Sequence, residues 1–450
     1  MADKIKGKLA NTREKLFKHR MVEQDIAKGL MIFAVIFCHT VPLPQLADTI
    51  LRSILGMVIP FFFFISGYNY KEPESLPDTF KGKAGLYWQR VKKRLRQILV
   101  PLLFCSVILL GIGAGYVALP FVNTDQTSLD MVKAFAGFWI SEPISSAVGL
   151  HTIGTFAGIE RLYEPNWFIL HMTLAYVIFY AVVDWALSNK KRYISVMFAL
   201  IAVSCIFNFF HLKMPWGFEN SAAYAAIMLM GCGVKHKKLF SEERYSKKYW
   251  PWINCGVCFL ICLGLGFLWP RAGQISGSGQ ITKIFSEFAE AAGQPAFAIL
   301  EIPYTILYSV ISSYFLIWAC KLIKKVRPIK FFFSYMGRNS LMILVFHLVF
   351  ASVACAIFKI QMATNIGKYA ETFEPIRLAV CALTVVLSLV FVTINVLCKE
   401  RFRKHKKMNK LCKEKCGELQ QDSSLSEEDI KAQIKAYRSE LRKTIKVKIA

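Results

Sequence analysis

Long apolar stretches recur along the whole sequence and decide what kind of fold it can form. A helix needs about 20 predominantly apolar residues to cross a hydrocarbon core about 30 Å thick. We count about ten such stretches, near residues 26–43, 49–70, 97–119, 166–187, 193–210, 221–235, 250–270, 303–322, 334–358 and 377–398. Because 55% of the residues are hydrophobic and only 19% are charged, the sequence predicts an all-α, polytopic membrane protein.

A strongly basic chain is typical either of a nucleic-acid-binding protein or of a membrane protein with basic cytoplasmic loops, and the placement of Lys and Arg decides between them. The formal net charge is +26 at pH 7, but Lys and Arg concentrate in alternate segments between the predicted spans, as expected when basic loops stay in the cytoplasm. This alternation predicts cytoplasmic N and C termini and no nucleic-acid partner. Residues 131–150 are interrupted by Lys133, Glu142 and Pro143. We therefore predict a re-entrant or interfacial segment there, because another crossing would invert every later loop.

Three regions follow from this pattern: a basic cytoplasmic leader over residues 1–22, a membrane domain over residues 23–398 and a basic cytoplasmic tail over residues 399–450. In the tail, Ser424 and Glu427 predict a helix-capping box. Apolar residues then recur at helical spacing and predict an amphipathic helix: Ile430, Ile434, Tyr437, Leu441 and Ile445. The helix either forms a homo-oligomer or lies on the anionic inner leaflet, and its basic content favours the leaflet.

The 13 cysteines do not form the pattern of a disulfide framework or a zinc site. Most lie inside predicted spans, where a thiol acts as a small apolar group. Cys412 and Cys416 in the tail lack the second Cys or His pair that a zinc site requires. We predict no structural metal.

The first predicted span carries titratable side chains, Asp25, Lys28 and His39. The step from Lys28 to His39 is about three helical turns, so both lie on one helix face roughly 16 Å apart. A titratable group in hydrocarbon costs several kcal/mol, which makes it a candidate functional group. The alternatives are a histidine that hydrogen-bonds between helices and charges that reach the membrane interface.

Three further segments combine with the first span into a recognisable pattern. They are FFFISGY at Phe62–Tyr68, a basic cluster before the third span, and a Gly-Arg-Asn-Ser run at 337–340 that precedes a helix containing His347. In order and spacing, they resemble the integral membrane acyltransferase-3 family, the O-acetylases of bacterial surface carbohydrates. The resemblance covers residues 22 to about 398. It departs at Gln97, where that family usually has a second arginine, three residues after Arg94.

The resemblance implies roles for individual residues. His39 is the expected catalytic base, and Asp25 and Lys28 are expected to be catalytic residues with it. Burial favours the neutral imidazole that can accept a proton. The basic cluster is expected to bind the donor's phosphates, or else to act as a topology anchor: Arg90, Lys93, Arg94 and Arg96. The expected substrate-binding residues are Ser66, Tyr68, Glu164, Asn166, Trp167, His171, Asn339 and His347. For Ser66 the alternatives are a nucleophile that accepts the acyl group and, more strongly favoured, close helix packing. For His171 and His347 the alternative is a structural role.

These expectations together describe an enzyme. It would be an O-acyltransferase of the bacterial cytoplasmic membrane that moves an acyl group, expected to be acetyl, from cytoplasmic acyl-CoA to a hydroxyl of a cell-envelope or exported carbohydrate or glycolipid. No tightly bound cofactor is expected, because acyl-CoA is the donor substrate. One alternative is a transporter or flippase of a polar or lipid-linked solute, although the paired Gly/Pro interruptions of inverted-repeat transporters are missing. Another is a membrane sensor whose tail helix recruits a partner.

Overall fold

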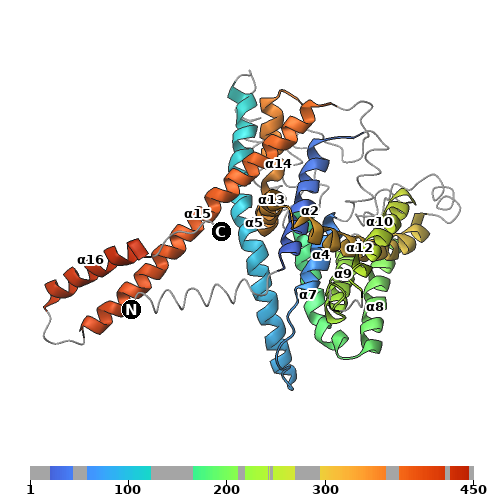
Figure 1. Ribbon diagram of the computed structural model, residues 1–450, viewed down its shortest axis with the longest axis horizontal. Helices are drawn as coiled ribbons and strands as arrows, with labels where there is room; N and C mark the ends of the chain where they lie inside the picture. Colours follow the sequence, from blue (N-terminus) through green and yellow to red (C-terminus); the bar gives the residue numbers. More distant parts are fainter. Residues whose placement is uncertain are drawn as a thin grey trace. The chain divides into compact units, whose positions relative to one another are not determined.

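Every regular element of the described residues is a helix in the computed structural model of the protein. The structure describes residues 21–43, 58–122, 166–210, 218–241, 243, 247–268, 294–360, 374–420 and 426–444. Its helices, drawn in Figure 1, are α2 (Val22–Thr40), α4 (Val58–Tyr68), α5 (Phe80–Val122), α7 (Asn166–Leu187), α8 (Lys190–Phe209), α9 (Phe218–His236), α10 (Trp250–Leu268), α12 (Gln294–Ile323), α13 (Arg327–Arg338), α14 (Ser340–Ile357), α15 (Ile376–Gln420) and α16 (Glu427–Thr444).

Within the described ranges, 5 helices are long and apolar enough to cross a membrane. They contain the segments Phe168–Leu187, Lys190–Phe209, Leu300–Ile323, Ser340–Ile357 and Ile376–Gln420. Two shorter apolar helices are Val58–Tyr68 and Trp250–Gly266. These features support a polytopic membrane protein. The span count of about ten and the cytoplasmic termini remain predictions, and the predicted re-entrant segment 131–150 lies outside the described residues.

The predicted span over residues 334–358 corresponds to parts of two helices rather than one. α13 ends at Arg338 and α14 begins at Ser340, and the side-chain amide of Asn339 between them donates to the carbonyl of Tyr335 at 2.9 Å. Gly337 and Asn339 have low helix propensity, and an amide that bonds a carbonyl of the preceding turn competes with helix continuation. Arg338 is therefore the last residue of α13 and not part of α14.

Glycines let two pairs of helices approach closely in the first compact unit, residues Met1–Thr384. α2 packs against α13 (Figure 1), and a Cβ added at Gly29 would overlap the carbonyl of Phe333. α4 packs against α9, and a Cβ at Gly67 would overlap the carbonyl of Met228. Small residues at a crossing are the usual way for membrane helices to gain van der Waals contact. These two crossings fix the start of α2 and the end of α4, which carry candidate site residues.

The second compact unit, Val385–Ala450, contains most of α15 and all of α16. The two helices lie side by side (Figure 1) and bury a small apolar core of Met408, Cys412 and Leu441. The predicted tail helix is present, and part of its apolar seam packs against α15; Ile434 and Tyr437 pack beside that core. Homo-oligomer formation through this helix stays a prediction. α15 is continuous through the predicted boundary between residues 398 and 399.

The cap of α16 differs from the predicted one by two residues. The Ser426 hydroxyl donates to the Asp429 carboxylate at 2.6 Å and accepts from the Asp429 backbone N–H at 3.2 Å. This is a capping-box arrangement with Asp in the place of Glu. The Ser424–Glu427 box has the same spacing, but Ser424 and the side chain of Glu427 lie outside what the structure describes, so that box stays a prediction.

Candidate functional site

A buried carboxylate between two cations stands at the start of α2. The Asp25 carboxylate lies 3.1 Å from Lys28 Nζ and 3.5 Å from Arg338 Nε, and its side chain is 3% exposed. α2 and α13 cross closely at this point: a Cβ at Gly337 would overlap the carbonyl of Asp25. The close crossing brings Arg338, the next residue of α13, to the Asp25 carboxylate. Arg338 is a site residue that the sequence analysis did not assign. The sequence feature that could have identified Arg338 is its place in the Gly-Arg-Asn-Ser run at residues 337–340.

His39 lies near the other end of α2 and meets a second imidazole. Its ring centroid is 5.1 Å from that of His347 on α14, with the planes inclined at 57°. His347 is 1% exposed. The sequence placed both residues among the candidates but did not predict that they meet. α2 therefore carries a charged cluster at one end and a histidine pair toward the other.

The residues of the basic cluster in the first part of α5 have different partners. Arg90 Nη1 lies 2.6 Å from the carboxylate of Asp184 on α7, which also accepts a hydrogen bond from the Tyr70 hydroxyl. Arg90 is thus paired within the protein, which reduces its availability for a phosphate. Among the residues predicted to bind the donor, Arg90 is the one for which the described contacts include a carboxylate.

Arg94 has neutral partners instead. Its guanidinium lies 4.7 Å from the ring centroid of Tyr176, and Nη1 donates to Gln97 Oε1 at 3.1 Å. Gln97, which stands where the family pattern has a second arginine, therefore orients the first. Lys93 and Arg96 are exposed. Tyr180 is a further hydrogen-bond partner of Arg94, and none of these three described partners is a carboxylate.

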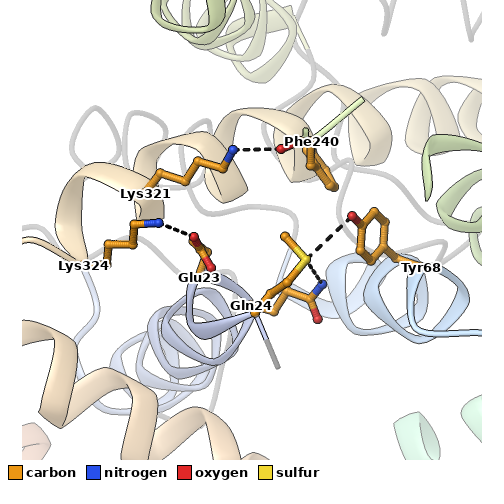
Figure 2. Close-up of polar contacts among 7 residues, drawn as sticks. Glu23, Gln24, Tyr68, Phe240, Lys321 and Lys324 are labelled. Carbon is orange, nitrogen blue, oxygen red and sulfur yellow. Dashed lines mark hydrogen bonds and ion pairs between the residues drawn. The ribbon is translucent and has the colours of Figure 1, made fainter. Parts of the chain in front are cut away.

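Further contacts anchor the start of α2 to α4 and α12 (Figure 2). Glu23 forms an ion pair with Lys324, and the Tyr68 hydroxyl donates to the sulfur of Met21 at 3.7 Å. Lys321 donates to the carbonyl of Phe240 at 2.8 Å. Tyr68, a predicted substrate-binding residue, is therefore part of the packing around the first turn of α2.

These contacts gather cationic side chains at one end of the first unit. There α2 and α5 begin, and α4, α7, α9, α12 and α13 end. The cations are Lys28, Arg90, Arg94, Lys235, Lys321, Lys324 and Arg338. The same ends are those that the charge alternation predicts to be cytoplasmic.

The other predicted substrate-binding residues are dispersed. The Ser66 hydroxyl donates to the carbonyl of Phe62 at 2.6 Å, one turn earlier in its own helix. His171 is buried, and its ring centroid lies 5.9 Å from that of Tyr224 on α9. Asn339 bonds the end of α13. Asn166 and Trp167 begin α7, but their side chains, like all of Glu164, lie outside what the structure describes.

The comparison with protein families identifies the class of protein. A family model described as an acyltransferase domain matches residues 22–394. The chain belongs to the acyltransferase-3 family. No curated protein and no solved structure matches it. As a member of this family it is a membrane acyltransferase, and the paired features of α2 lie within the matched region.

Proposed function

We propose that this acyltransferase moves an acetyl group from cytoplasmic acetyl-CoA to a hydroxyl of a cell-envelope or exported carbohydrate or glycolipid. The observation that carries the proposal is the construction of α2, which has a cationic cluster at one end and the His39/His347 pair toward the other. Acyl transfer needs both features. The coenzyme A part of the donor carries phosphates that a cationic cluster can bind, and the acceptor hydroxyl needs a base to take its proton.

The chemistry assigned to His39 is general base catalysis. The imidazole takes the proton of the acceptor hydroxyl as its oxygen attacks the thioester carbonyl carbon. The tetrahedral intermediate then collapses with cleavage of the C–S bond, and the coenzyme A thiolate leaves and takes up the proton held by His39. No acyl-enzyme is needed, which agrees with Ser66 being hydrogen-bonded to its own helix.

The donor would enter from the cationic end. Lys28 and Arg338 share a single carboxylate, so this cluster keeps a net positive charge and can attract the phosphates of coenzyme A. Lys28 and His39 are separated by roughly 16 Å along the helix axis, which an extended pantetheine arm can bridge. Acyl-CoA is thus a substrate that passes through the site, and the acceptor would reach His39 from the opposite face.

Inverted membrane vesicles test the proposal directly. Vesicles that contain the protein and receive radiolabelled acetyl-CoA on their cytoplasmic face should incorporate label into carbohydrate, in a form that mild alkali releases as acetate. Vesicles without the protein are the control. Label confined to lipids that carry no sugar, or absent with every acyl-CoA supplied, would contradict acetyl transfer to a carbohydrate or glycolipid.

Donor affinity should depend on the cationic end. We expect Lys28→Ala and Arg94→Ala each to weaken acetyl-CoA binding about tenfold, equivalent to about 1.4 kcal/mol, because each removes a cation available to a phosphate. Calorimetry on the purified protein in detergent measures the dissociation constant. Arg403→Ala is a matched control, since Arg403 is an exposed cation of the second unit. Unchanged affinity in both test variants would place the donor entrance elsewhere.

A further inference from the structure

The histidine pair on α2 and α14 has a defined hydrogen-bonding polarity. Nδ1 of His347 lies 2.6 Å from the carbonyl oxygen of Leu344. A carbonyl accepts hydrogen bonds and cannot donate, so Nδ1 must carry a proton. In a neutral ring, Nε2 is then the unprotonated nitrogen and a hydrogen-bond acceptor.

That acceptor has no partner among the described residues. Nε2 of His347 is buried and forms no hydrogen bond there, although buried polar atoms in proteins usually have a partner. The neighbouring ring is His39, at a centroid distance of 5.1 Å. Two imidazole rings at this centroid distance place a nitrogen of each within hydrogen-bonding range when those nitrogens point at one another.

We propose that His347 is a positioning residue whose Nε2 accepts a hydrogen bond from one ring N–H of His39. This bond fixes the tautomer and orientation of His39, so that its other nitrogen faces the acceptor hydroxyl. The role in catalysis rests on the proposed function, whereas the contact between the rings does not. Leu344 and His347 lie one helical turn apart on α14, so the backbone of that helix sets the polarity of the pair.

The arrangement performs the task of an orienting group behind a catalytic histidine. In serine proteases that group is a carboxylate, and its replacement by an amide that fixes the wrong tautomer lowers kcat by about 10⁴. A neutral imidazole can serve here because its proton is committed to Leu344. It also avoids a second charge in a buried site, where an unpaired charge is costly.

Two amide substitutions separate the nitrogens of His347. The amide of Asn in His347→Asn can reproduce Nδ1 and donate to Leu344, but it leaves no group at the place of Nε2. The longer side chain in His347→Gln brings its carbonyl oxygen to that place. We expect His347→Asn to lower the maximal rate of acetyl transfer about 10²-fold and His347→Gln to restore it to within about tenfold of wild type.

Kinetics distinguish positioning from substrate contact. With cell-envelope glycan extract as the acceptor, the half-saturating amount of extract should be the same for both variants and wild type, because His347 acts through His39. A raised half-saturating amount with an unchanged maximal rate would overturn the proposal and make His347 a substrate-binding residue. Equal losses in both variants, accompanied by lower melting temperatures, would show a purely structural role and would also overturn it.

A measurement without turnover makes the inference independent of the proposed function. Nitrogen-15 NMR of the full chain in lipid, labelled at its 8 histidines, reports which ring nitrogens carry protons. We expect the His39 signals, assigned by their loss in His39→Ala, to change in tautomer on His347→Asn and to be retained on His347→Gln. No change in either variant would overturn the proposal. If the coupling is present but vesicles transfer no acetyl group, the proposed function fails and the ring pair stands.

Discussion

His39→Ala is expected to abolish acetyl transfer, with a rate at least about 10²-fold below that of wild type. General base catalysis typically contributes 10² to 10⁴ in rate, and alanine leaves no group that can accept the hydroxyl proton. The imidazole of His347 lies against that of His39. Because Nδ1 of His347 is committed to Leu344, we do not expect that ring to replace His39.

The measurement is incorporation of radiolabelled acetate into cell-envelope material by membranes that contain equal amounts of each protein. Cys38→Ala is a matched control, because it removes a small side chain from the same turn of α2 but lies about 100° round the helix. Equal labelling by wild type and His39→Ala would contradict the assigned base. It would also revive the transporter or the sensor, and the sensor predicts that deleting residues 417–450 abolishes function while His39 variants remain active.

Helix positions were the most predictable part of the fold. The apolar stretch predicted over residues 166–187 corresponds to α7 (Asn166–Leu187), and that over residues 250–270 includes α10 (Trp250–Leu268). Such segments are bounded by charged or polar residues, so hydropathy alone locates them. The helix break within residues 334–358 was less predictable, because apolar residues continue on both sides of it. The local indications of the break are the weak helix formers Gly337 and Asn339.

The site was predictable in its members but not in its pairings. Asp25 and Lys28 are one helical turn apart, so sequence spacing suffices to join them. The contact of Asp25 with Arg338, and that of His39 with His347, join residues far apart in the chain. Helical periodicity describes one helix at a time and does not specify which faces meet. The same limit explains why Asp184, the partner of Arg90, was not among the candidates.

The crossing of α2 and α13 leads to the second large effect, which is on stability. Gly337→Ala is expected to destabilise the protein by about 1–3 kcal/mol or more, the usual cost of overpacking. A Cβ at this position would overlap the carbonyl of Asp25 and lie 2.9 Å from the backbone nitrogen of Gly29. Backbone atoms cannot rotate aside as a side chain can, so the helices must separate.

Separation of the two helices should also reduce activity, because it pulls Arg338 away from Asp25 and moves α14, which carries His347. Thermal unfolding in detergent and acetyl transfer in membranes measure the two effects on the same variant. Gly256→Ala is the matched control: Gly256 lies in α10 and a Cβ there meets nothing within 4 Å. Since Ala favours a helix over Gly by up to about 1 kcal/mol, that variant should be as stable as wild type or more so. If Gly337→Ala changed stability as little as Gly256→Ala does, the two helices would not touch at Gly337. The Asp25–Arg338 ion pair would then not depend on their close crossing.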